Sequence, residues 1–387
     1  MGDIMKKYIF IILIILIFIS LLNTKKELKI KEQRSIFISY IELKSYLNTD
    51  INTSKKNIKT MIKNIKKYKF NTIILQVRSF SDSIYKSNIY PWSSILTNEE
   101  GKYPGYDILD YFIKESHKEN ILLYAWINPY RVRLNTDIKS ISTKNPAYKY
   151  INTDIIYVNN GIYYNPAKEE VINLITNGVE EIVKNYKVDG ILFDDYFYPD
   201  NNIDIKDYNK YKKNNKITLQ EYHLNNVNKL VEKVHKVCMK YNTKFGISPD
   251  GNIENNYNKN YADVKLWCSS NKYIDFIMPQ IYYGFYNETK DFRKVIKEWE
   301  NIIKSNLGLH IALAFYKSGK VDKYAKSGSN EWIDNNDIIM KEIILSRNLN
   351  NYKGFALFRY DHLFNNNYKN VNSVKELENI KNIINNN

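Results

Sequence analysis

The chain has 387 residues, 44% of them hydrophobic, so it is long enough for one large or two ordinary domains with a sizeable core. Its formal net charge is +15 at pH 7, but lysine is spread along the whole chain and no arginine-rich patch stands out, so we expect no nucleic-acid partner. Two lone cysteines and five histidines form no CxxC, HxH or HExxH spacing, which argues against a transition-metal site, and we expect no cofactor.

The N-terminus has the pattern of an export signal. Lys6 and Lys7 precede an uncharged apolar run, YIFIILIILIFISLL, at residues 8–22. This run is slightly shorter than the roughly 20 residues of a spanning helix. Neither a small-x-small cleavage site nor a lipobox cysteine follows it, so a cleaved signal and an uncleaved membrane anchor are equal alternatives. We expect residues 1–29 to be this signal or anchor, and residues 30–387 to lie outside the cytoplasmic membrane, at the cell surface or secreted.

Eight short apolar segments follow, and amphipathic segments lie between them. The predicted strands are residues 35–43, 71–77, 121–128, 189–195, 244–249, 274–283, 309–316 and 354–360. Segments such as SKKNIKTMIKNIKKY and EEVINLITNGVEEIVKNY carry apolar residues at i, i+3 and i+4, as amphipathic helices do. Eight strand–helix repeats predict an α/β protein, a (β/α)8 TIM barrel formed as a single domain by residues 30–387. The alternative is an open doubly wound sheet, but no GxGxxG or GxxxxGK(S/T) motif supports it.

Polar and aromatic residues are concentrated after the predicted strands rather than before them. Functional groups of TIM barrels gather at the carboxyl ends of the strands. The carboxyl ends of the second to sixth predicted strands, with the residues after them, read QVRSFSDSIY, WINPYRV, DDYFYP, SPDGN and PQIYYGFY. We therefore expect the functional site at this end of the barrel.

Several long motifs resemble one known family. LQVRSFSDSIYKSNIYPWS, PGYDIL, AWINPYRV, VDGILFDDYFYP, FGISPDGN and DFIMPQIYY occur in the order seen in the glycosyl hydrolase-like 10 family, from about residue 34 to 363. The resemblance implies a TIM barrel related to glycoside hydrolases. It also implies an extracytoplasmic protein whose substrates are bacterial cell-wall or related amino-sugar glycans. It does not fix the substrate, because one barrel supports many chemistries.

The segment VDGILFDDYFYP contains the first catalytic candidates. Its DGxxxD pattern is similar to the nucleophile strand of amylase-type barrels, with Asp194 in the place of the nucleophile. It is also similar to the acidic fourth-strand motif of chitinase-type barrels, but Tyr196 stands where their catalytic glutamate would be. Successive strand residues point to opposite faces. If Asp194 faces the barrel axis, Asp195 faces the helix layer or curls into the loop, and we do not expect the two to close on one bond. We predict Asp194 as the primary catalytic carboxylate and Asp195 as the second, either catalytic or holding the loop.

Glycosidic cleavage ordinarily needs a second carboxyl group from another part of the site. Asp250 follows the fifth predicted strand, where amylase-type barrels place their acid. Asp82 follows the second strand and matches an acidic position of the family motif. We rank these two above Glu42 and Asp263, and each of the four can instead be a turn or capping residue.

Sugar binding requires flat apolar faces beside hydrogen-bonding groups. The candidate aromatic faces are Trp126, Tyr130, Tyr196, Tyr198, Tyr282 and Tyr283. The candidate polar groups are Gln76, Arg78, Asn128, Arg131, Asn165 and Gln280. The alternation of a strand predicts that Gln76 shares a face with Arg78, and Trp126 with Asn128. Either arginine would pair with the predicted carboxylates or bind the lactyl carboxylate of a muramyl sugar.

These features predict an extracytoplasmic, monomeric glycoside hydrolase whose substrate is a peptidoglycan-type or related amino-sugar polysaccharide. The alternative is a non-catalytic carbohydrate-binding or wall-organising protein built on a hydrolase barrel. A metal-dependent hydrolase with an oxygen-only Ca²⁺ or Mg²⁺ site is a third, weaker alternative.

Overall fold

The computed structural model describes residues 31–195, 197–304 and 306–385. From Glu32 onward the chain forms one compact unit. The predicted signal or anchor, residues 1–29, lies outside the described residues. Among the helices that the structure describes, none is long and apolar enough to cross a membrane.

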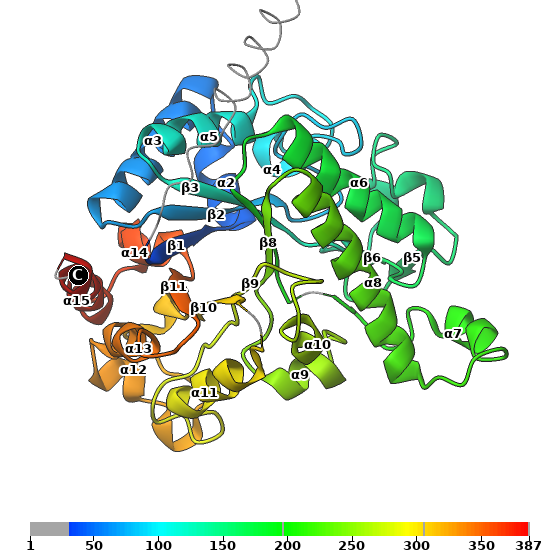
Figure 1. Cartoon of the computed structure of the whole chain (residues 1–387). Coiled ribbons are helices and arrows are strands. Elements are labelled where there is room, and N and C mark those ends of the chain that lie inside the picture. The colour runs from blue at the N-terminus through cyan, green and yellow to red at the C-terminus, as the bar shows by residue number, and fades with distance from the viewer. Residues whose placement is uncertain (1–30, 196, 305, 386–387) are drawn as a thin grey trace, which may run out of the picture. The chain divides into compact units, whose positions relative to one another are not determined.

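Eight parallel strands close into a barrel, which confirms the predicted fold (Figure 1). Their order around the barrel is β1-β11-β10-β9-β8-β7-β3-β2, so neighbours in space follow each other in the chain. The strands are β1 (Gln33–Ile38), β2 (Thr72–Arg78), β3 (Leu122–Ile127), β7 (Gly190–Phe193), β8 (Lys244–Ile247), β9 (Phe276–Ile277), β10 (Gly308–Leu313) and β11 (Tyr352–Leu357).

Two strands end well before their predicted last residues, for local reasons. β1 ends at Ile38 because Ser39 caps a helix: its side chain and that of Glu42 form a capping box with each other's backbone N–H. β9 contains only Phe276 and Ile277. Pro279 follows it closely and has no N–H to donate to a ladder.

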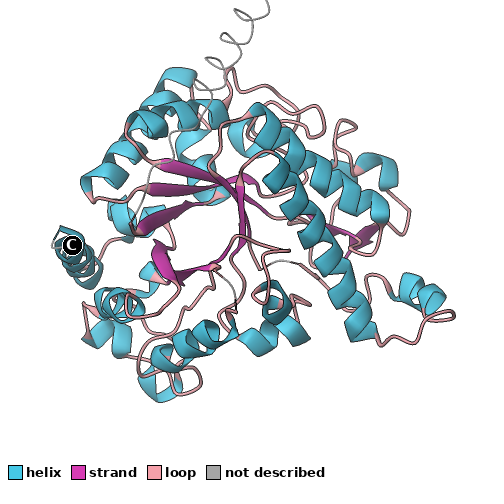
Figure 2. Ribbon diagram, viewed as in Figure 1, coloured by secondary structure: helices cyan, strands magenta, loops and turns pink. Residues whose placement is uncertain are grey.

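Helices surround the barrel on its outer side (Figure 2). Asp50 caps the long α3, and Thr218 caps α8 with a capping box. The longer helices are α2 (Tyr40–Leu47), α3 (Ile51–Lys67), α5 (Ile108–Lys118), α6 (Glu169–Asn185), α8 (Leu219–Lys240), α11 (Phe292–Ile302), α13 (Ile338–Ser346) and α15 (Val371–Asn385). The short ones are α4 (Ser94–Thr97), α7 (Ile205–Tyr211), α9 (Ile253–Asn258), α10 (Val264–Trp267), α12 (Glu331–Asp334) and α14 (Tyr360–Phe364).

The strands separate two apolar cores. Ile191 and Phe193 belong to the large core between strands and helices, whereas Leu192 belongs to a smaller core inside the barrel. The inner core is so tight that a Cβ atom on Gly246 would lie 2.3 Å from the ring of Phe276, so a larger residue would fit only if that ring shifted. Because Leu192 points inward, strand alternation directs Asp194 toward the mouth of the barrel.

A small antiparallel sheet, which the sequence did not predict, lies beside the barrel mouth. It contains β4 (Arg131–Arg133), β5 (Ile156–Val158) and β6 (Ile162–Tyr164) in the order β4-β6-β5. All three strands come from the long segment between β3 and α6. This sheet holds Arg131 at the edge of the site.

Candidate active site

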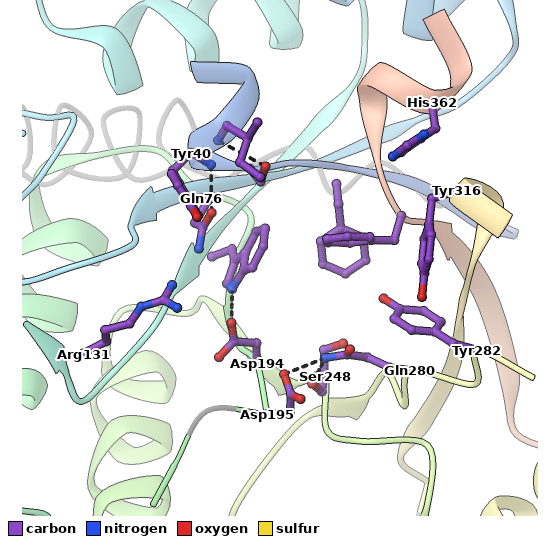
Figure 3. A pocket seen from close by; sticks show the side chains of 15 residues that line it. Tyr40, Gln76, Arg131, Asp194, Asp195, Ser248, Gln280, Tyr282, Tyr316 and His362 are labelled. Atoms are coloured by element: carbon purple, nitrogen blue, oxygen red, sulfur yellow. Dashed lines mark hydrogen bonds between the residues drawn. The ribbon is translucent and has the colours of Figure 1, made fainter. Parts of the chain in front are cut away.

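A cavity of about 390 Å³ opens at the carboxyl ends of the barrel strands (Figure 3). Asp194 and Asp195 both line it. It is also lined by predicted binding residues and by residues that were not predicted; the full lining is Phe37, Ser39, Tyr40, Ile41, Gln76, Trp126, Arg131, Asp194, Asp195, Ser248, Gln280, Tyr282, Tyr316, Phe358 and His362.

Asp194 is held by a relay of hydrogen bonds across three strands. Its Oδ2 atom accepts from Trp126 Nε1 at 3.0 Å and from Asn128 Nδ2. Asn128 Oδ1 in turn accepts from Gln76 Nε2 at 2.5 Å, and Gln76 Oε1 accepts from the backbone N–H of Tyr40 at 2.8 Å. The relay fixes the orientation of both amide side chains. Two donors converge on one oxygen of Asp194, an arrangement that suits a carboxylate anion. The predicted shared face of Trp126 and Asn128 is thus confirmed.

Asp195 lines the same cavity as Asp194, so it does not face the helix layer, the first of the two expected positions. Strand β7 ends at Phe193, so the alternation that would turn Asp195 outward stops there. Asp195 Oδ1 accepts from Gln280 Nε2 at 2.9 Å, and the same amide nitrogen donates to Ser248 O at 3.0 Å.

The two carboxyl groups differ in their environment. Burial raises the pKa of Asp195 to about 7; the negative charge of Asp194 acts in the same direction, and the hydrogen bond from Gln280 opposes both. Asp195 therefore keeps its proton to a higher pH than an ordinary aspartic acid does. Such a pair supplies an acid and a base within one site.

The structure does not place Asp250 or Asp82 in the lining of the cavity. Asp250 Oδ1 accepts from the backbone N–H of Asn252 at 2.7 Å, and its charge contributes to the raised pKa of Asp195. Asp82 is 2% exposed and accepts from Ser93 Oγ at 2.8 Å. Burial raises the pKa of Asp82 to about 7.

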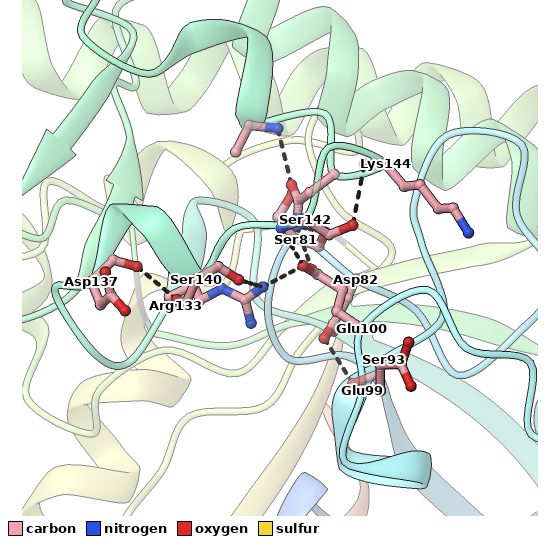
Figure 4. A network of polar contacts seen from close by, with 12 residues as sticks. Ser81, Asp82, Ser93, Glu99, Glu100, Arg133, Asp137, Ser140, Ser142 and Lys144 are labelled. Carbon is pink, nitrogen blue, oxygen red and sulfur yellow. Dashed lines mark hydrogen bonds and ion pairs between the residues drawn. The ribbon is translucent and has the colours of Figure 1, made fainter.

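Asp82 belongs to a separate polar network between the segments that follow β2 and β3 (Figure 4). Glu100 forms an ion pair with Arg133 of β4. It also accepts from Asn145 Nδ2 at 2.7 Å and from the backbone N–H of Ser142 at 2.8 Å. The network therefore attaches β4, and with it the cavity residue Arg131, to the segment after β2.

The two lower-ranked acids have structural partners. Glu42 is fully buried, takes part in the capping box of α2 and pairs with Arg359. Asp263 caps α10 by accepting from the backbone N–H of Leu266 at 3.1 Å. Among the described residues there is no group of three or more His, Cys, Asp or Glu that could hold a metal ion.

The two predicted arginines lie on different sides of the barrel wall. Arg131 lines the cavity, and its Nε donates to Ser79 O at 3.1 Å. Arg78 is 2% exposed and lies over the ring of Tyr90, 4.5 Å from its centroid, against α6. The pairing of β2 with β3 shifts register between Gln76 and Arg78. This irregularity breaks the alternation, so the predicted shared face of Gln76 and Arg78 is wrong.

Four other predicted residues lie outside the cavity lining: Tyr130, Asn165, Tyr198 and Tyr283. Tyr130 is buried. Asn165 donates to Asp207 Oδ2 and to Asp154 O, both at 2.9 Å, and so fixes the loop before α6. Tyr198 donates to Asp204 Oδ2 at 2.8 Å. Tyr196 lies outside the described residues.

An aromatic wall faces the two carboxyl groups across the cavity, and sequence reasoning found only part of it (Figure 3). The ring centroids of Tyr282 and Tyr316 are 5.9 Å apart, and those of Tyr316 and Phe358 are 6.1 Å apart. His362 completes this wall. Burial lowers the pKa of His362 to about 4, so it is neutral near pH 7. The signal was present in LAFY and LFRYDH, which lie at the carboxyl ends of the seventh and eighth predicted strands.

Comparison with known proteins identifies the family of the chain. The model of the family described as "Glycosyl hydrolase-like 10" matches residues 32–333. The chain is 31% identical over 355 residues to glycosyl hydrolase YngK of Bacillus subtilis, covering 85% of this chain and 68% of YngK. It is 31% identical over 323 residues to glycosyl hydrolase DigH of Escherichia coli K12, covering 76% and 72%.

Solved structures share the fold at low identity. The PgaB (BpsB) glycoside hydrolase domain from Bordetella bronchiseptica superposes with a TM-score of 0.58 at 11% identity, covering 87% of this chain and 96% of that domain. An exo-β-N-acetylglucosaminidase from Vibrio harveyi superposes with a TM-score of 0.52 at 9% identity, covering 90% and 54%. The structural likeness supports the barrel fold alone. The family is assigned from the sequence matches. The chain belongs to the glycosyl hydrolase-like 10 family.

Proposed function

We propose that this protein is an extracytoplasmic glycoside hydrolase that cleaves peptidoglycan-type or related amino-sugar glycans, with Asp194 and Asp195 as its catalytic residues. One observation carries the proposal. Two adjacent carboxyl groups line one cavity, one of them bound by two donors and the other with its pKa raised to about 7. Family membership supports a hydrolase that acts on glycans. The extracytoplasmic location rests on the apolar run at residues 8–22.

Asp195 is the proton donor in this proposal. In its protonated form it transfers a proton to the glycosidic oxygen as the bond from that oxygen to the anomeric carbon breaks. Its raised pKa keeps a large fraction protonated near neutral pH. Gln280 and Ser248 hold the carboxyl group on the wall of the cavity.

Asp194 supplies the negative charge, and an amino sugar supplies the nucleophile. Neither Asp250 nor Asp82 lines the cavity, so we assign the carboxyl chemistry to the adjacent pair. The carbonyl oxygen of a 2-acetamido group can itself attack the anomeric carbon, as in substrate-assisted glycosidases. Asp194 then accepts the acetamido N–H and stabilises the cyclic cation. Water attacks this intermediate, the Asp195 carboxylate takes up its proton, and the product retains its configuration.

The rest of the cavity fits a sugar. Tyr282, Tyr316 and Phe358 offer apolar faces to pyranose rings opposite the acids. Arg131 offers a guanidinium group to an acidic substituent such as a lactyl carboxylate.

The test is hydrolysis by the purified chain of peptidoglycan, of peptide-free glycan strands and of chitin oligosaccharides. We expect release of reducing ends by the wild type and none by Asp194→Asn or Asp195→Asn. Analogues with a 2-hydroxyl in place of the 2-acetamido group should not be cleaved. Unchanged release by both variants would move the chemistry elsewhere. Glycan bound by the wild type without any release would favour the non-catalytic binding protein.

A further inference from the structure

A basic projection, residues 205–216, stands apart from the cavity. We name it the α7 arm; it comprises α7 and the turn that follows, with the sequence IKDYNKYKKNNK. Four exposed lysines lie at its end, and none forms a salt bridge within the described residues: Lys210, Lys212, Lys213 and Lys216. The arm contains one acidic residue, Asp207, whose carboxylate is turned inward to Lys168 Nζ at 2.8 Å and Asn165 Nδ2 at 2.9 Å. The tip therefore presents uncompensated positive charge.

The arm is an ordered element. The rings of Tyr208 and Tyr211 pack on Tyr222 of α8, with centroids 5.6 and 5.2 Å away. Tyr208 Oη also donates to Ile217 O at 3.1 Å. These contacts fix the backbone, so the lysines are displayed at defined positions.

The arm leaves the barrel at the end where the cavity opens. The segment that carries Asp194 and Asp195 out of β7 continues directly into it. At its base, Asp204 accepts from Tyr198 Oη at 2.8 Å and contacts His223 Nε2 at 2.7 Å, which ties the segment to α8. From this base α7 projects beyond the other helices (Figure 1).

We infer that the α7 arm is a docking surface for an acidic glycan strand, whose carboxylate groups it binds while a distant part of the same strand occupies the cavity. The inference rests on the proposed function and adds to it a preference for long, carboxylated strands. Lysines act as mobile point charges, which suits a flexible polyanion, and the arm contains no arginine for bidentate recognition of bases. Exposed charges contribute little singly, and four together are worth roughly tenfold in affinity at low salt.

The experiment measures binding without cleavage. The parent is the full chain carrying Asp194→Asn, and the probe is an end-labelled peptide-free glycan strand with free lactyl carboxylates. The arm variant adds Lys210→Gln, Lys212→Gln, Lys213→Gln and Lys216→Gln. The control variant removes the same charge from the flank of the barrel, at exposed lysines of α3: Lys56→Gln, Lys59→Gln, Lys63→Gln and Lys67→Gln.

We expect the arm variant to bind the acidic strand roughly tenfold more weakly than its parent in low salt, and the control variant less than about threefold more weakly. On the same strand with its carboxylates converted to amides, parent and arm variant should bind alike. The inference would be overturned if both variants lost affinity equally or if the arm variant lost none. It would also be overturned if parent and arm variant still differed in affinity for the amidated strand. So would arm-dependent binding of double-stranded DNA that is tighter than binding of the strand, since the arm would then be a nucleic-acid surface.

Hydrolysis separates this inference from the proposed function. With Asp194 restored, the arm variant should cleave short chitin oligosaccharides with unchanged kcat/KM and long acidic strands with a raised KM. Cleavage of both substrates with no effect of the arm would refute the docking surface alone. An arm-dependent affinity without cleavage of any glycan would refute the hydrolase alone.

Discussion

Replacing Asp195 by asparagine should abolish hydrolysis and, at the same time, stabilise the fold above neutral pH. Burial and the charge of Asp194 raise the pKa of Asp195 from 3.8 to about 7. That difference means that the folded protein disfavours the charged carboxylate by about 4 kcal/mol. Because the raised pKa belongs to the folded state, the free energy of unfolding falls as pH rises from about 4 to about 7 and stays low above that. Asparagine has no charge to bury and keeps a carbonyl oxygen that can accept from Gln280.

The assay compares urea unfolding of the wild type and Asp195→Asn at pH 4 and pH 8. We expect similar stability at pH 4 and a more stable variant at pH 8, by up to about 4 kcal/mol. In the wild type, kcat/KM should fall above about pH 7, tenfold per pH unit, because only the protonated acid can donate. A flat profile from pH 7 to 9, or an asparagine variant less stable than the wild type at pH 8, would refute the reasoning.

Asp82 provides a matched control. Burial raises its pKa to about 7 as well, but it lies outside the cavity lining. Asp82→Asn should therefore stabilise the protein at pH 8 in the same way while the fall of kcat/KM above pH 7 remains. If kcat/KM of Asp82→Asn no longer fell above pH 7, the assignment of Asp195 as the catalytic acid would be wrong.

Three further predictions concern the cavity and the barrel. Asn128→Ala removes a donor to Asp194 and should lower kcat by roughly 10²-fold in steady-state assays, with little change in glycan affinity; a change in affinity alone would contradict the relay. Tyr316→Ala should raise KM about tenfold at nearly constant kcat, because it removes a stacking face; a loss confined to kcat would argue against the aromatic wall. Gly246→Ala should lower the free energy of unfolding in urea by about 1–3 kcal/mol, because its methyl group would overlap an aromatic ring inside the barrel; unchanged stability would show that the ring can move.

The fold and the first catalytic candidate follow from local patterns. Alternation of apolar strands with amphipathic helices is visible within windows of ten to twenty residues, and eight repeats of it permit few architectures. Asp194 comes two residues after the inward-facing Leu192, so strand alternation alone predicts that the Asp194 side chain points the same way. The same holds for Trp126 and Asn128, which both reach Asp194.

The choice of a partner for Asp194 required the tertiary structure. Asp250 and Asp82 follow strands as Asp194 does, but whether a carboxyl group turns into the cavity depends on the loop that carries it. Asp195 enters the cavity because β7 stops at Phe193, and its raised pKa comes from burial in the folded barrel and from the charge of Asp194.

Tertiary packing also decided the register of β2 against β3 and the residues that form the aromatic wall of the cavity. An irregularity between Gln76 and Arg78 in the pairing of β2 with β3 sends one side chain into the cavity and the other beneath α6. The sequence of a single strand does not contain that shift, because register depends on both partners. Tyr316 and His362 line the same cavity as Asp194 because the barrel closes, which places the ends of β10 and β11 across the cavity from β7. The chain's local patterns thus determined the barrel and the position of one acid at its mouth, while closure and register, which are long-range properties, decided what surrounds that acid.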